Sequence, residues 1–327
     1  MSDKQRPKIG IALSGASGRA IAHIGVLEVF KENNIPIDYI VGCSSGAMIA
    51  ASYATNTMGE LKDLFKRLNV PMLLSMWSTK NATGGLFNME NAKPELGRFT
   101  KGLKFEDIDH PKVGFVAADL DTGELINITK GDMFEAFRAA GAVPGLFEPV
   151  VIDGRILVDG GLVNIVPTKA VQEMGADIVI GVNIAATKFI YEKKLPIWRG
   201  YRLVTRLLGL QFFREHVWPK LSSRIFFQFD SQSDLLEEKD IKVPGVFSVL
   251  AKAFDHSLNV SEHWTESDMA CDLMLEPRVK HFGKAEFSNL DNIYQEGRRS
   301  AQNALPKIRS LIQDYAKNNP QFKKEEI

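Results

Sequence analysis

The residues whose types and spacing best suggest chemistry form the pentapeptide Gly-Cys-Ser-Ser-Gly at positions 42–46. A segment that we predict to be a buried strand, residues 37–41, precedes it, and a helix of small residues follows. A tight strand-to-helix turn would expose Ser44 Oγ, and Gly42 and Gly46 let such a turn form without Cβ clashes. The N-terminal end of the helix would stabilise the oxyanion that forms when Ser44 attacks a carbonyl carbon. The pattern predicts a serine nucleophile, with a plain Gly/Ser turn as the alternative.

A serine nucleophile needs a base, and Asp159 is the best candidate. It ends a predicted strand, residues 155–158, and the glycines at 160 and 161 leave room for another group to approach. We expect this strand to be parallel to its neighbours, which would direct Asp159 into the crevice where such sheets bind ligands. A simple turn is the alternative. Five histidines after the pentapeptide lie in no recognisable catalytic setting: His110, His216, His256, His263 and His281. His216 and His281 have charged neighbours and are predicted to be surface side chains.

A third segment, Ser-Gly-Ala-Ser-Gly-Arg at residues 14–19, leads into a predicted helix. Such a small-residue loop can direct backbone N–H groups at an anion. It lacks the Gly-Lys-Ser/Thr ending and the G-x-G-x-x-G spacing of nucleotide-binding loops. An NADP-binding loop of short-chain reductase type is a rival, but the usual Tyr-x-x-x-Lys pair is missing. We therefore predict an oxyanion loop made by four residues: Gly15, Ala16, Ser17 and Gly18.

Alternating strand and helix patterns place these three segments in one sheet. Apolar residues recur every three positions from Ile21 to Phe30, which indicates a helix that ends near Asn33. The alternation predicts an α/β protein in which helices cover both faces of a mainly parallel sheet. Strands are predicted at residues 8–13, 37–41, 113–118, 124–129, 155–158 and 177–182, and helices at 21–33, 133–140 and 169–174.

The composition excludes several classes of protein. Of 327 residues, 45% are hydrophobic and 24% charged, and equal numbers of Lys plus Arg and Asp plus Glu give no net charge. A nucleic-acid binder with a wholly basic surface is therefore not expected. Two cysteines, Cys43 and Cys271, exclude a disulfide scaffold and a Cys-based zinc site, and we interpret Cys43 as a small buried residue. With no signal peptide, membrane span or linker in the sequence, we expect a cytoplasmic protein with a single domain over residues 1–327.

Together these segments resemble the patatin-like phospholipase family, especially its compact bacterial members and the catalytic domain related to neuropathy target esterase. The resemblance covers about residues 8–185. It rests on the glycine-rich segment and helix at 9–27, the elbow at 42–46, the segments at 137–150 and 159–167 around the second catalytic residue, and the strand at 175–182.

The resemblance implies a three-layer α/β/α sandwich and a Ser–Asp dyad, with Ser44 as nucleophile and Asp159 as its partner, and no metal or cofactor. It implies a hydrolase of lipid carboxylic esters, of lysophospholipase or phospholipase A type, that forms an acyl-enzyme on lipid or lysophospholipid substrates. A lipid acyltransferase with the same dyad and a weakly active lipid-binding protein remain alternatives.

The sequence departs from the family at Ala16 and Ser17, where the family has adjacent glycines. If either position needs a positive φ, the oxyanion hole would be distorted and the rate reduced. Arg19 matches a position that is usually basic in the family. It would hold the loop or a substrate phosphate, or it is a solvated residue at the start of a helix.

A basic, aromatic segment follows these motifs. Residues 188–224 carry nine Lys and Arg against two Glu, together with Trp198 and Trp218. This composition predicts a lipid-facing edge and a peripheral membrane contact, with packing on the core or on a second subunit as the alternative. We assign it to an insertion over about 188–260, before a C-terminal strand and helix at about 271–317. We expect no nucleic-acid partner, and a homo-oligomer remains open.

Overall fold

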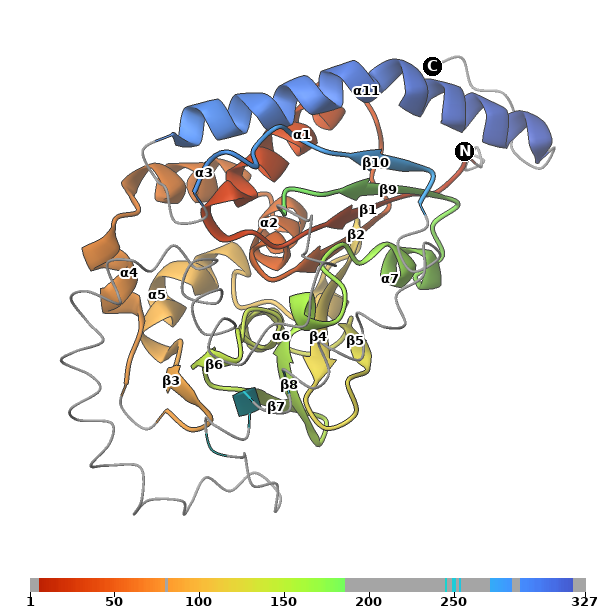
Figure 1. The fold of residues 1–327 in the computed structure, drawn as a ribbon. Helices are drawn as coiled ribbons and strands as arrows, with labels where there is room; N and C mark the ends of the chain where they lie inside the picture. The colour runs from red at the N-terminus through yellow and green to blue at the C-terminus, as the bar shows by residue number, and fades with distance from the viewer. Residues whose placement is uncertain are drawn as a thin grey trace, which may run out of the picture.

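The computed structural model describes residues 6–79, 82–185, 245, 249, 250, 253, 271–283 and 289–319. Within these residues an eight-stranded sheet has the order β10-β9-β1-β2-β4-β8-β7, with β5 also paired to β4 (Figure 1). The strands are β1 Ile9–Leu13, β2 Tyr39–Cys43, β4 Lys112–Asp119, β5 Leu125–Ile128, β7 Val150–Ile152, β8 Arg155–Asp159, β9 Ile178–Val182 and β10 Leu273–Leu275. A separate parallel pair joins β3 Gly85–Phe87 to β6 Gly145–Phe147.

Helices lie on both faces of the central sheet. The α-helices are α1 Ile21–Glu32, α2 Ser45–Ala54, α3 Met58–Arg67, α4 Val70–Met76, α5 Lys93–Leu96, α6 Met133–Ala140, α7 Thr168–Glu173 and α11 Leu290–Asn318. The 3-10 helices are η1 Ser17–Ala20, η2 Glu90–Ala92, η3 Gly97–Phe99, η4 Phe105–Asp107 and η5 Gly160–Leu162. In the described part of the chain, no helix combines the length and apolar character needed to cross a bilayer.

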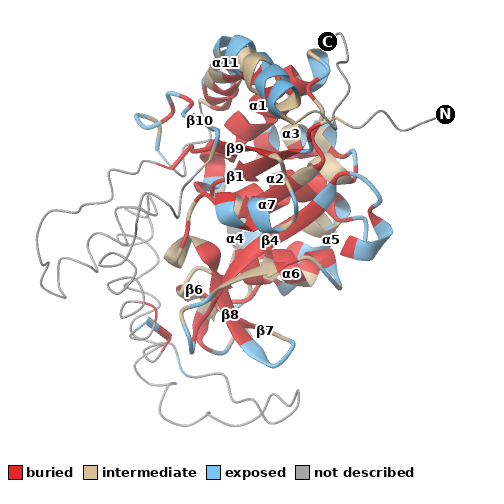
Figure 2. Cartoon of the chain, turned by 90° about the vertical axis from the view of Figure 1, so that its right-hand side faces the viewer, coloured by how far each residue is buried: buried red, intermediate tan, exposed pale blue. Residues whose placement is uncertain are grey.

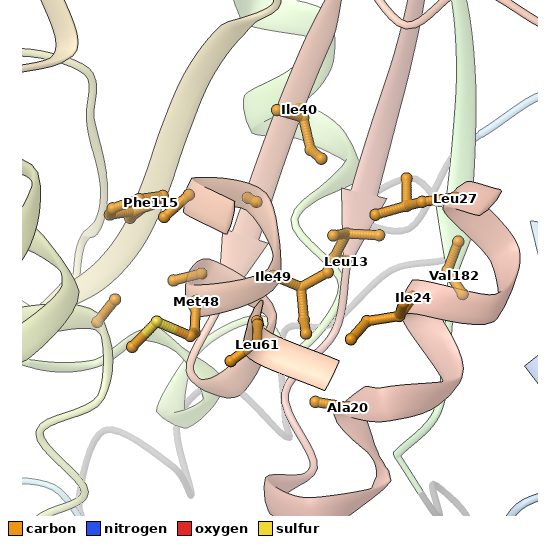
Figure 3. Packing of buried hydrophobic residues seen from close by; sticks show 14 of the residues in the cluster. Leu13, Ala20, Ile24, Leu27, Ile40, Met48, Ile49, Leu61, Phe115 and Val182 are labelled. Carbon is orange, nitrogen blue, oxygen red and sulfur yellow. The ribbon is translucent and has the colours of Figure 1, made fainter. Parts of the chain in front are cut away.

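The two larger hydrophobic clusters, one on each face of the sheet, hold the layers together. On one face, side chains of β1, β2, β4 and β9 pack against α1, α2 and α3 in one cluster, which includes Leu13, Ile24 and Ile49 (Figure 3). On the other face, Val41 and Val179 belong to a cluster with α7. Figure 2 shows the resulting pattern, in which the central strands are buried and the exposed residues lie on the outer helices and the loops. The predicted three-layer α/β/α architecture is confirmed.

The mainly parallel part of the sheet agrees with the predicted alternation. Strands β10, β9, β1, β2 and β4 run parallel to one another. The apolar stripe predicted for the first helix is fully buried in α1, which ends one residue before Asn33. The second strand extends further than predicted, because β2 includes Gly42 and Cys43.

The strand that ends at Asp159 runs antiparallel to its neighbours, which corrects the prediction of a parallel strand. Strand β8 pairs antiparallel with both β4 and β7. Asp153 and Gly154 join β7 to β8 with φ values of 49° and 79°. Positive φ at both residues of a two-residue loop is typical of a type I′ hairpin, which connects only antiparallel strands. The Asp-Gly pair was therefore the sequence signal for this reversal.

The long helix α11 packs along α1, far from it in sequence (Figure 1). The two helices approach closely where glycines face backbone. A Cβ at Gly25 would lie 2.4 Å from Tyr294 O, and one at Gly297 would lie 2.0 Å from Ala22 O. The C-terminal helix therefore supports the helix that follows the glycine-rich loop.

The predicted basic segment at residues 188–224 lies outside the described residues. Of the wider insertion predicted at about 188–260, only residues 245, 249, 250 and 253 are described.

Candidate active site

Ser44 occupies the strained turn between β2 and α2. Its φ is +52° and its ψ is −124°, in the left-handed region that residues with a Cβ rarely adopt. Positions 42 and 46, two residues before and after Ser44, require glycine because any side chain there would clash with backbone atoms. A Cβ at Gly42 would lie 2.3 Å from Gly46 O, and one at Gly46 would lie 2.5 Å from Leu13 O. This is the conformation of a nucleophile elbow, in which the central side chain is exposed at the strand end.

Asp159 reaches the same end of the sheet from the opposite direction. Strand β4 lies between β2 and β8, with Val116 opposite Cys43 and Ala117 opposite Asp159. Strand β8 runs antiparallel to β4, and its last residue, Asp159, lies only one β4 position away from Cys43, the last residue of β2. The two carboxyl ends therefore meet across β4, and the Cys43 sulfur lies 3.8 Å from Asp159 Oδ1.

The Asp159 carboxylate is buried and held by the turn that follows it. The residue is 6% exposed, and Oδ1 accepts a hydrogen bond from Gly161 N at 2.8 Å. The Asp159 N–H donates to Ala142 O at 2.9 Å, which fixes the backbone. A Cβ at Gly160 would lie 2.6 Å from Val116 O. The two glycines therefore make room for β4 and for the carboxylate itself.

The glycine-rich loop packs directly on the nucleophile. A Cβ at Gly15 would lie 2.6 Å from Ser44 Cβ and 3.3 Å from Ser44 Oγ. Ala16 is extended, with φ −173°, and its N–H donates to Ser45 Oγ at 3.0 Å. Ser17 has the positive φ, +51°, that the sequence analysis identified as a difficulty, and its side chain is exposed. Gly18 is buried at the start of η1. Which N–H groups form the oxyanion hole stays a prediction, and that of Ala16 already has a partner.

Cys43 is fully buried, as predicted. Burial and the nearby Asp159 carboxylate raise the pKa of its thiol well above the ordinary value, against a smaller opposite effect of the Gly15 N–H. Because the thiolate is the reactive form of cysteine, this residue is unsuited to act as a second nucleophile. Its thiol instead donates a hydrogen bond to Asp159 Oδ1.

Comparison with known proteins identifies the family. A family model described as patatin-like phospholipase matches residues 11–171, which include the loop, the elbow and Asp159. The chain belongs to the patatin-like phospholipase family.

The curated relatives that this patatin-like chain matches are similar to it at modest identity. An uncharacterized NTE family protein of Mycobacterium bovis is 28% identical over 178 residues, which are 54% of this chain and 49% of the relative. Another, of Mycobacterium tuberculosis, is 25% identical over 316 residues, 93% of this chain and 47% of the relative. Lysophospholipase NTE1 of Coccidioides immitis is 26% identical over 318 residues, 92% of this chain and 18% of the relative. The chain therefore spans about half the length, or less, of these relatives.

A solved structure, that of VipD from Legionella pneumophila, aligns with 98% of this chain and 82% of its own at 11% identity. Its TM-score of 0.34 is too low to support an argument.

Arg19 holds a distant segment against the loop of this patatin-like chain. The residue is 5% exposed, so the interpretation as a solvated arginine is wrong. Its Nε donates to Phe282 O at 2.9 Å and its Nη2 to Lys280 O at 3.1 Å. These bonds fasten residues 280–282 to η1 directly after the glycine-rich loop. Of the two functional roles considered for Arg19, holding the loop is the one these contacts support.

His23 is a site residue that the sequence analysis missed. It is fully buried on α1, and its Nε2 lies 2.8 Å from Ser14 O. Burial lowers the pKa of the imidazole to about 4, although the hydrogen bond to Ser14 opposes this effect. A histidine within an apolar helix gave no sequence signal beyond its place shortly after the loop. His281 is exposed, as predicted, and so is His110, whereas His216, His256 and His263 lie outside the described residues.

Among the residues that the structure describes, no three His, Cys, Asp or Glu side chains gather in a way that could hold a metal ion.

Proposed function

We propose that this chain hydrolyses fatty acyl esters of lipids, as a lysophospholipase or phospholipase A, through a dyad of Ser44 and Asp159. The observation that carries the proposal is the meeting of the two strand ends, which brings the Asp159 carboxylate against the residue preceding a strained serine. Family membership and a relative named lysophospholipase NTE1 support the substrate class. The basic segment at 188–224 is the proposed contact with the lipid surface.

The first half of the proposed reaction acylates the serine. Ser44 Oγ attacks the ester carbonyl carbon while its proton moves to the Asp159 carboxylate, and the carbonyl π electrons become an oxyanion. The oxyanion collapses, the bond from carbon to the leaving alcohol breaks, and the alcohol leaves with the proton from Asp159. A carboxylate is a weak base for a hydroxyl, and the burial of Asp159 favours this transfer because it penalises the charged form.

The second half releases the acid. Water attacks the acyl-enzyme carbonyl carbon as Asp159 takes its proton, and collapse of the new oxyanion breaks the bond to Ser44 Oγ, which recovers the proton. In both halves the positive N-terminal end of α2 and N–H groups of the loop at residues 15–18 are the proposed stabilisers of the oxyanion.

Hydrolysis of a lysophospholipid by purified protein tests the proposal. Ser44→Ala and Asp159→Asn should each abolish release of fatty acid while the protein stays folded, and the double variant should be no worse, since the two act as a unit. Asp153→Asn is the matched control, because it changes an exposed carboxylate on the same hairpin and should remain active. Retention of most activity by Asp159→Asn would overturn the dyad. Acyl transfer to an added alcohol in place of fatty acid release would favour the acyltransferase.

A further inference from the structure

A buried hydrogen bond ties α1 to the glycine-rich loop. His23 Nε2 lies 2.8 Å from Ser14 O, and a carbonyl oxygen can only accept, so the imidazole donates through Nε2. Its Nδ1 is buried and, among the described residues, has no hydrogen-bond partner. A buried polar atom without a partner costs about 1–3 kcal/mol. An apolar side chain would therefore suit this core position better if packing were its only role.

The peptide group between Ser14 and Gly15 connects this hydrogen bond to the side of the loop where Cys43 lies. In a planar trans peptide the C=O and N–H point in opposite directions. The oxygen of this peptide faces His23, and the Gly15 N–H, which points the opposite way, is the backbone group that lowers the pKa of the Cys43 thiol against the effect of burial. The orientation of the peptide is thus held at both ends.

The Cys43 thiol completes the connection. The sulfur lies 3.8 Å from Asp159 Oδ1, within reach of a thiol hydrogen bond. Because burial keeps the thiol protonated, Cys43 is the donor and the carboxylate the acceptor. The same oxygen accepts the Gly161 N–H at 2.8 Å. Oδ1 is therefore held by two donors, and one of them belongs to a chain that begins at His23.

We propose that His23 and Cys43 are positioning residues for Asp159. Through the peptide between them they fix Oδ1 of the carboxylate and so hold Asp159 in place as the proposed base for Ser44. Every donor in the chain points toward the carboxylate, so each hydrogen bond polarises the next. This inference rests on the proposed dyad and adds to it two residues that do not touch the substrate.

Two pairs of variants test the chain by removing or keeping each donor. Cys43→Ala and His23→Leu remove the donors, whereas Cys43→Ser and His23→Gln keep an O–H or N–H near the same position. The first pair should lower kcat about tenfold, as expected for loss of a hydrogen bond that ends on a charged group, with KM nearly unchanged. The second pair should recover most of this loss, which a role in packing alone would not produce.

Controls on the same elements measure the effect of stability. Val41→Ala and Leu27→Ala shorten fully buried apolar side chains on β2 and α1 that form none of these hydrogen bonds. They should lower the unfolding temperature at least as much as the test variants and leave kcat unchanged. The double variant His23→Leu with Cys43→Ala should be no slower than the slower single variant, because one break already interrupts the chain.

The outcomes separate this inference from the proposed function. Loss of kcat in the controls equal to that in Cys43→Ala, or multiplicative losses in the double variant, would overturn the positioning role. Ser44→Ala in the same assay reports on the dyad itself. If it is inactive while His23→Leu and Cys43→Ala keep full kcat, only the positioning role is wrong. If it remains active, the proposed function fails as well.

Discussion

Replacing Gly15 with alanine should inactivate the protein far more than it destabilises it. The added Cβ would lie 2.6 Å from Ser44 Cβ, 3.2 Å from Cys43 O and 3.3 Å from Ser44 Oγ. Carbon atoms in contact prefer about 3.5–4.0 Å, so the serine must move by about 1 Å. A displacement of this size costs about 100-fold in rate. Overpacking of this kind costs about 1–3 kcal/mol in the free energy of unfolding.

The assay compares the rate at which a fluorophosphonate phosphonylates Ser44 with the stability of the protein in urea. Gly59→Ala is the matched control, because nothing lies within 4 Å of a Cβ at Gly59 in α3. That variant should react at the wild-type rate and gain about 0.5–1 kcal/mol, since alanine is the better helix former. If Gly15→Ala reacts within about threefold of wild type while folded, the proposed contact between loop and nucleophile is refuted.

Three further variants test the glycine-rich loop, the Arg19 contact that holds residues 280–282 beside it, and Asp38, which precedes β2. Ser17→Gly should raise the free energy of unfolding in urea by about 1 kcal/mol and keep activity, because φ +51° is costly for a residue with a Cβ; no gain would contradict this. Arg19→Met should lower that free energy by about 2–3 kcal/mol, because the carbonyl of Phe282 loses a charged donor; an unchanged value would show that the contact is dispensable. Burial raises the pKa of Asp38, but the Arg6 guanidinium and the Ile9 N–H outweigh it and hold that pKa below its usual range. The carboxylate therefore stabilises the fold above about pH 4, and this contribution is lost as the pH falls through the lowered pKa. Asp38→Asn should accordingly melt lower than wild type at pH 7, with a difference that shrinks below about pH 4; a difference independent of pH would contradict the assignment.

Local signals in the sequence were sufficient for the elements that carry the nucleophile. The helix predicted at 133–140 has those bounds in the structure, where Asp132 Oδ1 caps it by accepting the N–H groups of Phe134 and Glu135. The apolar stripe of α1 and the glycines around Ser44 are likewise features of neighbouring residues, and each determined its element correctly.

Relations between distant segments could not be predicted in the same way. The direction of β8 depends on its pairing with β4, and without that pairing Asp159 was assigned to a parallel strand. The hydrogen-bond partner of Arg19, Phe282, lies 263 positions further along the chain. A solvated side chain was therefore equally compatible with the local sequence. His23 acts on a backbone oxygen, and no motif of side chains marks such a contact.

The site of covalent attachment tests the central claim most directly. After brief reaction with a fluorophosphonate, proteolysis and mass spectrometry should find the phosphonyl group on Ser44 and none on Cys43. The same reaction in Asp159→Asn should be at least about 100-fold slower, because the base that accepts the serine proton is lost. A label on another residue of the active protein, or an unchanged rate in Asp159→Asn, would contradict the Ser–Asp dyad.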